Sequence, residues 1–193
     1  MELLERIYGY EGLTRADLQK IFDAHTKVTF ERGDFILKAG EQSNEYYCLQ
    51  KGLVRSYVMD YNGHDITTEF FGEGQIIIEV NSLFQRIPSQ ENFQALTDCV
   101  CWKIEFAAFQ QLYHEIEMFS EWGRAWMAQA LFYFKHRSVS MITQSATDRY
   151  LSLMQERPQI LRDAPLKTIA SYLGITDTSL SRIRKEITKV SAQ

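Results

Sequence analysis

The C-terminal stretch from Pro165 to Val190 reads PLKTIASYLGITDTSLSRIRKEITKV, and it decides how the rest of the chain is interpreted. Apolar residues recur at helical spacing on both sides of Gly174, which predicts two helices joined by a tight turn. Glycine is typical of such a turn, because it enters the left-handed conformation that ends a helix without a steric penalty. Thr176 is a good N-cap for the second helix, and Ile175 fills the gap between the helices. The pattern indicates a helix-turn-helix unit.

The second helix of this unit is expected to present a polar outward face. Small hydroxyl residues followed by Arg and Lys suit a helix in the DNA major groove, where Thr and Ser reach base edges or phosphates and Arg can hold a guanine edge. A helix N-terminus also attracts phosphate. A solvated basic face on an ordinary helical hairpin is the alternative, and the turn chemistry disfavours it. The candidate DNA-binding residues are Thr168, Thr176, Asp177, Thr178, Ser179, Ser181, Arg182, Lys185 and Lys189.

The charge distribution agrees with a polyanion partner at this end of the chain. The 193 residues have a net charge of −4, yet residues 144–193 hold 8 basic and 5 acidic residues, against 13 and 20 in residues 1–143. Hydrophobic residues make up 45%, as in an ordinary globular protein. The sequence lacks an apolar run of membrane-spanning length and a signal-peptide pattern at its start, so the cytoplasm is the expected location.

Residues 26–104 change to short alternating stretches punctuated by glycines, which is typical of an antiparallel barrel. Asn62-Gly63 predicts a tight hairpin between two of these stretches. Segment 75–84 is also interpreted as part of a strand. The three cysteines, Cys48, Cys99 and Cys101, are expected to be small buried residues, because their number and spacing fit neither a disulfide framework nor a zinc pair.

A long helix is predicted over residues 116–145, where no proline interrupts a wide belt of apolar residues. A helix that is apolar on more than one side must bury apolar residues on more than one side. A second copy of the helix would bury part of this surface in a homodimer, and burial of the whole helix within one domain is the alternative. The chain therefore divides into an effector barrel (1–115), a dimerisation helix (116–145) and a helix-turn-helix domain (146–193), with a hinge or short turn at 157–165. The candidate residues of the dimer helix are Trp122, Trp126, Ala130 and Phe134.

This order of elements resembles, over nearly the whole chain, the Crp–Fnr family of cAMP receptor protein and fumarate–nitrate reductase regulators. The segment IASYLGITDTSLSRIRKEI (169–187) is similar to the versions in Bacteroidetes-type members. The resemblance implies an α+β fold with a cyclic-nucleotide-binding-like double-stranded β-helix and a winged-helix-like helix-turn-helix. It implies a homodimeric transcription regulator on near-palindromic double-stranded DNA, with RNA polymerase and an unidentified small-molecule effector as further candidate partners. It also places Asp177, Thr178 and Arg182 at base-reading positions.

The same resemblance locates a candidate effector pocket at Ile78, Glu79, Val80, Ser89 and Gln90. In the family's cAMP pattern, an arginine follows the glutamate by ten residues and neutralises the cyclic phosphate. Here Ser89 stands at that position and Glu91 follows it. Because a buried anion without a cation is costly, we expect cAMP not to bind and the pocket to be degenerate or to take a less charged ligand. Arg86 is nearby but displaced.

We expect no cofactor, no metal and no catalysis. A cysteine cluster for an iron–sulfur centre is missing before Cys48, and His64 is better explained by its hairpin than as a haem ligand. The alternative to a DNA-binding regulator is a cupin-like small-molecule-binding or enzymatic barrel with a helical dimer scaffold. That reading requires a pair of histidines near a glutamate on strands, and His64 beside Glu69 has no partner histidine.

Overall fold

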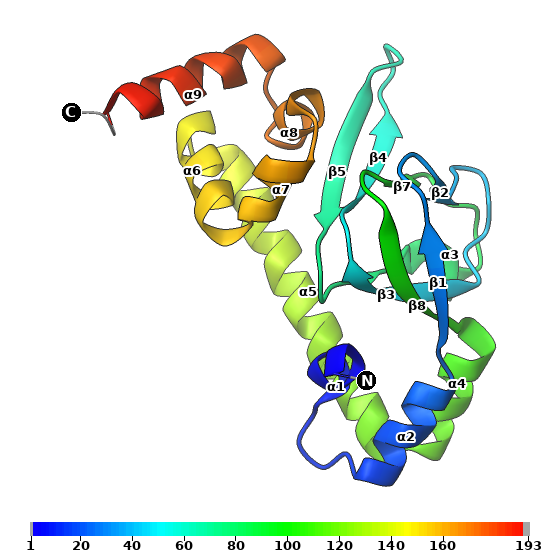
Figure 1. Cartoon of the computed structure of the whole chain (residues 1–193). Coiled ribbons are helices and arrows are strands. Elements are labelled where there is room, and N and C mark those ends of the chain that lie inside the picture. The colour runs from blue at the N-terminus through cyan, green and yellow to red at the C-terminus, as the bar shows by residue number, and fades with distance from the viewer. Residues whose placement is uncertain (1, 191–193) are drawn as a thin grey trace.

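The computed structural model describes residues 2–190 and shows helices at both ends of a β unit (Figure 1). Two helices, α1 (Glu2–Tyr8) and α2 (Arg15–Asp23), precede the strands, and α2 begins with a capping box formed by Thr14 and Asp17. The strands are β1 (Thr26–Phe30), β2 (Phe35–Leu37), β3 (Glu45–Lys51), β4 (Val54–Met59), β5 (Asp65–Phe71), β6 (Ile76–Ile77), β7 (Asn92–Ala95) and β8 (Cys99–Glu105).

These strands form two antiparallel sheets, ordered β1-β8-β3-β6 and β2-β7-β4-β5. Side chains of both sheets share one buried cluster, which includes Leu49 and Cys101 of the first sheet and Val54 and Phe93 of the second. The chain is therefore α+β, with the antiparallel β unit where the alternating pattern predicted it. All three cysteines are free and buried.

Segment 75–84 differs from the sequence prediction. Strand β6 covers only Ile76–Ile77, and a short helix, α3 (Val80–Gln85), follows at once. The reason is local: the carboxylate of Glu79 accepts the backbone N–H of Ser82 and so caps α3, which makes this apolar run a helix start instead of a longer strand.

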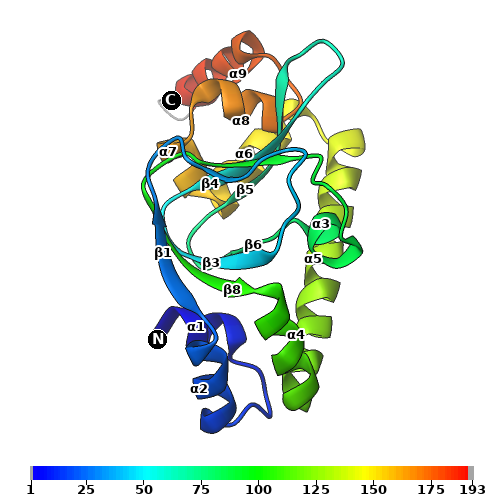
Figure 2. The ribbon, with the colours of Figure 1, turned by 90° about the vertical axis from the view of Figure 1, so that its right-hand side faces the viewer.

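The remaining helices run from the base of the β unit to the C-terminus. Helix α4 (Phe106–Glu115) leads into α5 (Glu117–Thr143), which lies alongside the strands and joins the lower helices to the C-terminal ones (Figure 2). The C-terminal helices are α6 (Ala146–Glu156), α7 (Pro158–Asp163), α8 (Leu166–Tyr172) and α9 (Asp177–Val190). Helix α7 occupies the segment predicted as a hinge or turn, because Pro158 at its first position is compatible with a helix start.

Residues 146–190 contain helices and, within that described range, no strand, so the helix-turn-helix lacks wing strands there. Among residues 2–190, none of the helices combines the length and apolar character that crossing a membrane requires.

Two further buried clusters attach the helices to the β unit. One joins α1, α2 and α4 to β3 and to the first half of α5. In it Trp122 is 7% exposed and its Nε1 donates to the carbonyl of Ile7 at 2.9 Å. The other joins α6, α7, α8 and α9 to Leu53 and Phe70 of the β unit. The C-terminal helices thus share a core with the sheet that contains β4 and β5.

Candidate functional site

The turn between α8 and α9 has the geometry that its residues predicted. Gly174 adopts a φ of 68°, and its N–H donates to the carbonyl of Ser171 at 3.0 Å. The N–H of Ile175 donates to the carbonyl of Ala170 at 3.0 Å, which closes the end of α8. The hydroxyl of Thr176 accepts the N–H of Ser179 at 3.2 Å and caps α9. The two helices are therefore held at a defined angle by local contacts.

Helix α9 buries one face and exposes the face predicted to read DNA. Leu180 and Ile183 are buried at 0% and 5% exposure. Arg182 is exposed, and its contact with Glu186 is a long one at 4.0 Å between two exposed side chains, so it holds the guanidinium weakly. The other candidate residues on this helix divide into exposed (Thr176, Asp177, Thr178, Lys185, Lys189) and half-buried (Ser179, Ser181).

Thr168 does not belong to this exposed face. It is 7% exposed, and its hydroxyl donates to the carbonyl of Pro165 at 2.7 Å in the first turn of α8. Because Thr168 is buried and its hydroxyl is bonded within the first turn of α8, it lies apart from the exposed candidates of α9.

Helix α8 lies between the β unit and α9 (Figure 1). Ser171 of α8 makes two hydrogen bonds to Thr67 of β5: its hydroxyl accepts the Thr67 N–H and donates to the Thr67 hydroxyl, both at 3.1 Å. Helix α8, which packs against α9, therefore contacts strand β5 of the β unit directly.

A buried ion pair between Arg157 and Glu69 crosses the same interface. Arg157, just before α7, places Nη1 2.7 Å from Oε1 of Glu69 on β5, and the side chains are 15% and 8% exposed. Its Nη2 donates to the carbonyl of Phe70 and, at 3.0 Å, to Oε1 of Gln75. The negative charge of Glu69 raises the pKa of Arg157 against the opposing effect of burial, so the guanidinium stays charged.

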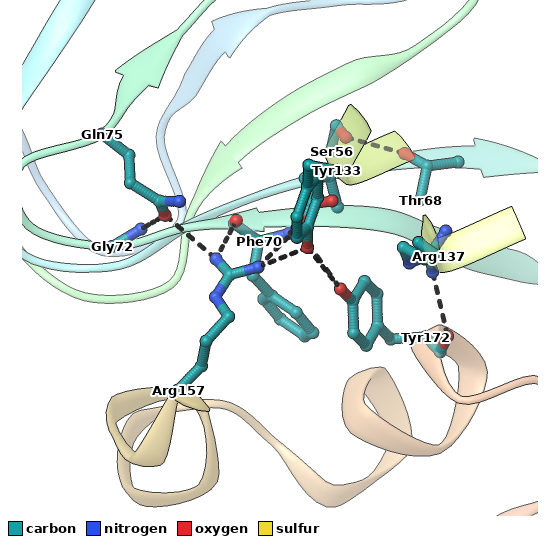
Figure 3. Close-up of polar contacts among 10 residues, drawn as sticks. Ser56, Thr68, Phe70, Gly72, Gln75, Tyr133, Arg137, Arg157 and Tyr172 are labelled. Carbon is teal, nitrogen blue, oxygen red and sulfur yellow. Dashed lines mark hydrogen bonds and ion pairs between the residues drawn. The ribbon is translucent and has the colours of Figure 1, made fainter. Parts of the chain in front are cut away.

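Helix α5 joins this pair (Figure 3). The hydroxyl of Tyr133 donates to Glu69 at 3.2 Å and lies 3.0 Å from the hydroxyl of Tyr172 on α8. Arg137 donates to the carbonyl of Tyr172 at 3.0 Å and packs 4.1 Å from its ring. Burial raises the pKa of Tyr133, so it remains a neutral donor. We call Glu69, Arg157, Tyr133 and Tyr172 the interdomain network; the sequence carried no signal for it, because its members come from four separate elements.

A cavity of about 480 Å³ lies between the β unit and α5. Glu69 lines it, so the interdomain network forms part of its wall. The lining also includes the aromatic side chains Phe71, Phe93, Trp126 and Phe134 and the polar side chains Arg6, Ser56, Thr68, Gln75 and Glu91.

Only two of the five candidate effector residues line this cavity. Ile78 and Val80 line it. The other three are not among its lining residues. Glu79 is buried and caps α3. Ser89 is 4% exposed, and its hydroxyl donates to the carbonyl of Glu91 at 2.8 Å, whereas Gln90 is exposed. Glu91, which was not among the candidate effector residues, lines the cavity together with Glu69.

Two arginines near this region, Arg86 and Arg55, are bonded outside the cavity. Arg86 donates to the carbonyl of Ser43 at 3.0 Å and to Oδ1 of Asn44 at 2.6 Å, and Arg55 pairs with Asp65 at 2.8 Å. His64, the candidate ligand of the cupin-like alternative, has a 70% exposed side chain 3.3 Å from Asp60 in the β4–β5 hairpin.

The exposed apolar face of α5 includes only some of the predicted dimer-helix residues. Trp122 lies in a buried core, whereas Trp126, Ala130 and Phe134 line the cavity, and Phe134 is also 52% exposed. Burial of Trp122 follows from the packing of α1 against α5, which the helical pattern alone does not reveal. The large side chains that α5 leaves exposed are Met127, Leu131, Phe132, Tyr133, Phe134, Val139, Met141 and Ile142.

Comparison with known proteins agrees with this architecture. Residues 27–115 match the family model of the cyclic nucleotide-binding domain. The type II regulatory subunit of cAMP-dependent protein kinase from Drosophila melanogaster is 21% identical over 113 residues, which is 58% of this chain and 28% of that protein. The chain spans about a quarter of the length of the curated relatives it matches.

The solved structures match over more of the chain. FixK2 from Bradyrhizobium japonicum has a TM-score of 0.75 at 17% identity, with 86% of each chain covered. A transcriptional regulator assigned to the crp/fnr family, from Eubacterium rectale, has a TM-score of 0.70 at 16% identity, covering 91% of this chain and 84% of that one. These similarities include both the β unit and the C-terminal helices.

Proposed function

We propose that this chain, which has the Crp/Fnr-like fold and a cyclic nucleotide-binding domain in residues 27–115, is a DNA-binding transcription regulator that acts as a homodimer and is not an enzyme. The observation that carries the proposal is the exposed face of α9. Thr178 and Arg182 lie one turn apart on this face, and Thr176 caps the N-terminus of the helix. A helix of this kind can enter the major groove, with Arg182 reading a guanine edge.

Dimerisation through α5 is the second part of the proposal. Leu131, Phe132 and Ile142 are 68%, 74% and 83% exposed, an apolar patch that a monomer would leave in water. A second copy of α5 would cover it and would set two α9 helices in a symmetric pair. Half-sites one helical turn apart, about 34 Å, would then form a near-palindromic operator.

The β unit would act as a sensor that no longer takes a cyclic nucleotide. Ser89 stands where a phosphate partner would be needed, and Arg86 is bound to the 43–44 loop. The interdomain network supports a coupling between the cavity and the DNA-binding helices, because Glu69 lines the cavity and also bonds Arg157 and Tyr133.

DNA binding is tested with the full-length protein. A preferred site is selected from random duplexes, and affinity for this site and for a scrambled duplex is measured by fluorescence anisotropy at two salt concentrations. Arg182→Ala is expected to cost about 1–3 kcal/mol on the selected site and far less on the scrambled one. Arg162→Ala, which removes an exposed arginine from α7, is the charge-matched control and should leave both affinities nearly unchanged. Equal losses of Arg182→Ala on both duplexes would assign Arg182 to phosphate binding.

Light scattering at micromolar concentration tests the dimer. The wild-type mass should be twice that of the chain, and Leu131→Asp should yield a monomer because it places a charge in the proposed seam. Met59→Asp alters another exposed apolar residue, 55% exposed in the β4–β5 hairpin, and should stay dimeric. A wild-type monomer would contradict this part of the proposal.

A further inference from the structure

The cavity between the β unit and α5 has walls suited to a small organic molecule. Its volume, about 480 Å³, falls in the usual range for ligand sites. Phe71 and Phe93 face it from the sheet, and Trp126 and Phe134 line it from α5. Aromatic side chains on opposite walls can hold a flat apolar body, and their ring faces also attract positive charge.

The charged groups of the cavity are mainly acidic. Glu91 lies directly before β7 and is half-buried, and the salt bridges of the described residues include none to its carboxylate. Hydroxyls of Thr68 and Ser56 are its hydrogen-bond partners. Its pKa is raised by burial and, further, by the negative charges of Glu79 and Glu69. A ligand that brought a positive charge to Glu91 would relieve both effects.

Glu69 adds to this acidic character although it is paired. Its Oε1 bonds to Arg157 and Tyr133, but its Oε2 is buried without a hydrogen-bond partner among the described residues. Because this oxygen has almost no accessible surface, a ligand would feel its negative charge without bonding to it, and that charge disfavours an anion in the cavity. Arg6 is the exception in the lining: it is an exposed side chain on α1 whose guanidinium lies against Gly74.

We propose that this cavity binds an organic cation, an amine on a flat apolar skeleton, with its ammonium group at Glu91 and its apolar part between Phe93 and Trp126. This deepens the proposed sensor function and rests on it. The geometry gives the ammonium a carboxylate and two hydroxyls, and it gives the skeleton aromatic walls from the sheet and from α5. An anionic ligand of the same skeleton would meet Glu91 and Glu69 instead.

The test uses three probes with one ring system and different charge: tryptamine, the neutral alcohol indole-3-ethanol and indole-3-acetate. Binding to the full-length protein is measured by calorimetry and by ligand-observed NMR. Tryptamine should bind saturably and at least tenfold more tightly than indole-3-acetate, with the alcohol between them. Indole-3-acetate binding as tightly as tryptamine, or no binding of tryptamine at millimolar concentration, would overturn the proposal.

Two matched variants test whether Glu91 is the carboxylate that binds the ammonium group. Glu91→Gln keeps the size of the side chain and should remove the preference for tryptamine. Glu73→Gln changes an exposed carboxylate outside the cavity lining and should keep it. If Glu91→Gln is folded, by circular dichroism, and still prefers tryptamine, Glu91 is not the anchor and the proposal is wrong. Loss of binding on Arg6→Gln would likewise overturn it.

These outcomes are separable from the proposed function. The anisotropy and light-scattering measurements are made without any probe, so a failed amine test leaves the DNA-binding result intact. Conversely, probe binding is read on the protein alone and stays interpretable if DNA binding fails.

Discussion

Removing Arg157 is expected to destabilise the protein strongly, because the change leaves the charge of Glu69 buried without its partner. The two side chains are only 15% and 8% exposed, and the ion-pair distance is 2.7 Å. Breaking one side of such a buried pair costs about 3–5 kcal/mol in general. Since Tyr133 still donates to Glu69 and some water reaches Arg157, we expect Arg157→Gln to lower the free energy of unfolding by about 3 kcal/mol.

Urea unfolding followed by tryptophan fluorescence measures this change. The control is Arg162→Gln on α7, whose pair with Asp163 has a similar distance, 2.8 Å, but an arginine side chain that is 72% exposed. An exposed pair is worth about 0–1 kcal/mol, so the control should be near neutral. The two arginines differ in burial and in the further hydrogen bonds that Arg157 makes to Tyr133, Phe70 and Gln75.

The double variant separates the pair from the packing around it. Glu69→Gln combined with Arg157→Gln removes both charges, and the double variant should be less destabilised than the sum of the two single changes by about 1–3 kcal/mol. If the two effects simply add, or if Arg157→Gln costs no more than Arg162→Gln, the ion pair does not stabilise the interdomain contact and the reasoning is refuted.

Three further stability predictions concern particular conformations and protonation states. Gly174→Ala should cost about 1–2 kcal/mol in urea unfolding, because the residue has a φ of 68° and a Cβ there would lie 2.7 Å from Cε of Met141; a neutral result would contradict the left-handed turn. Thr176→Ala should cost about 1 kcal/mol by removing the cap of α9, and Thr176→Ser should restore it. Burial lowers the pKa of His25 below its ordinary value of about 6.5, while its Nε2 bonds to the hydroxyl of Tyr8 at 2.9 Å. The folded protein therefore holds His25 neutral, so its stabilising effect is complete above about pH 6.5 and is lost as pH falls through the lowered pKa. Thermal unfolding from pH 7 to 5 should show this loss, and the His25→Gln variant should show less of it.

Local sequence determined the parts of the molecule that depend on a few neighbouring residues. The α8–α9 turn followed from Gly174 and Thr176, since a positive φ and an N-cap are properties of single positions. The exposed polar face of α9 followed from helical spacing. Period-two alternation likewise placed the β unit, and the absence of proline from 116 to 145 allowed the length of α5.

Only the tertiary structure decided which side chains meet across the chain. Glu69 and Arg157 are 88 positions apart and pair because α8 docks on β5, and no local pattern encodes that docking. Trp122 was predicted to lie in a dimer seam and Thr168 was a candidate DNA-binding residue, yet both side chains are 7% exposed, and Trp122 bonds to α1, an element distant in sequence. The cavity, too, exists only because α5 lies along the sheet. Backbone preferences act over one turn of chain, whereas burial depends on packing partners, and so the helix-turn-helix was predictable while the network and the pocket were not.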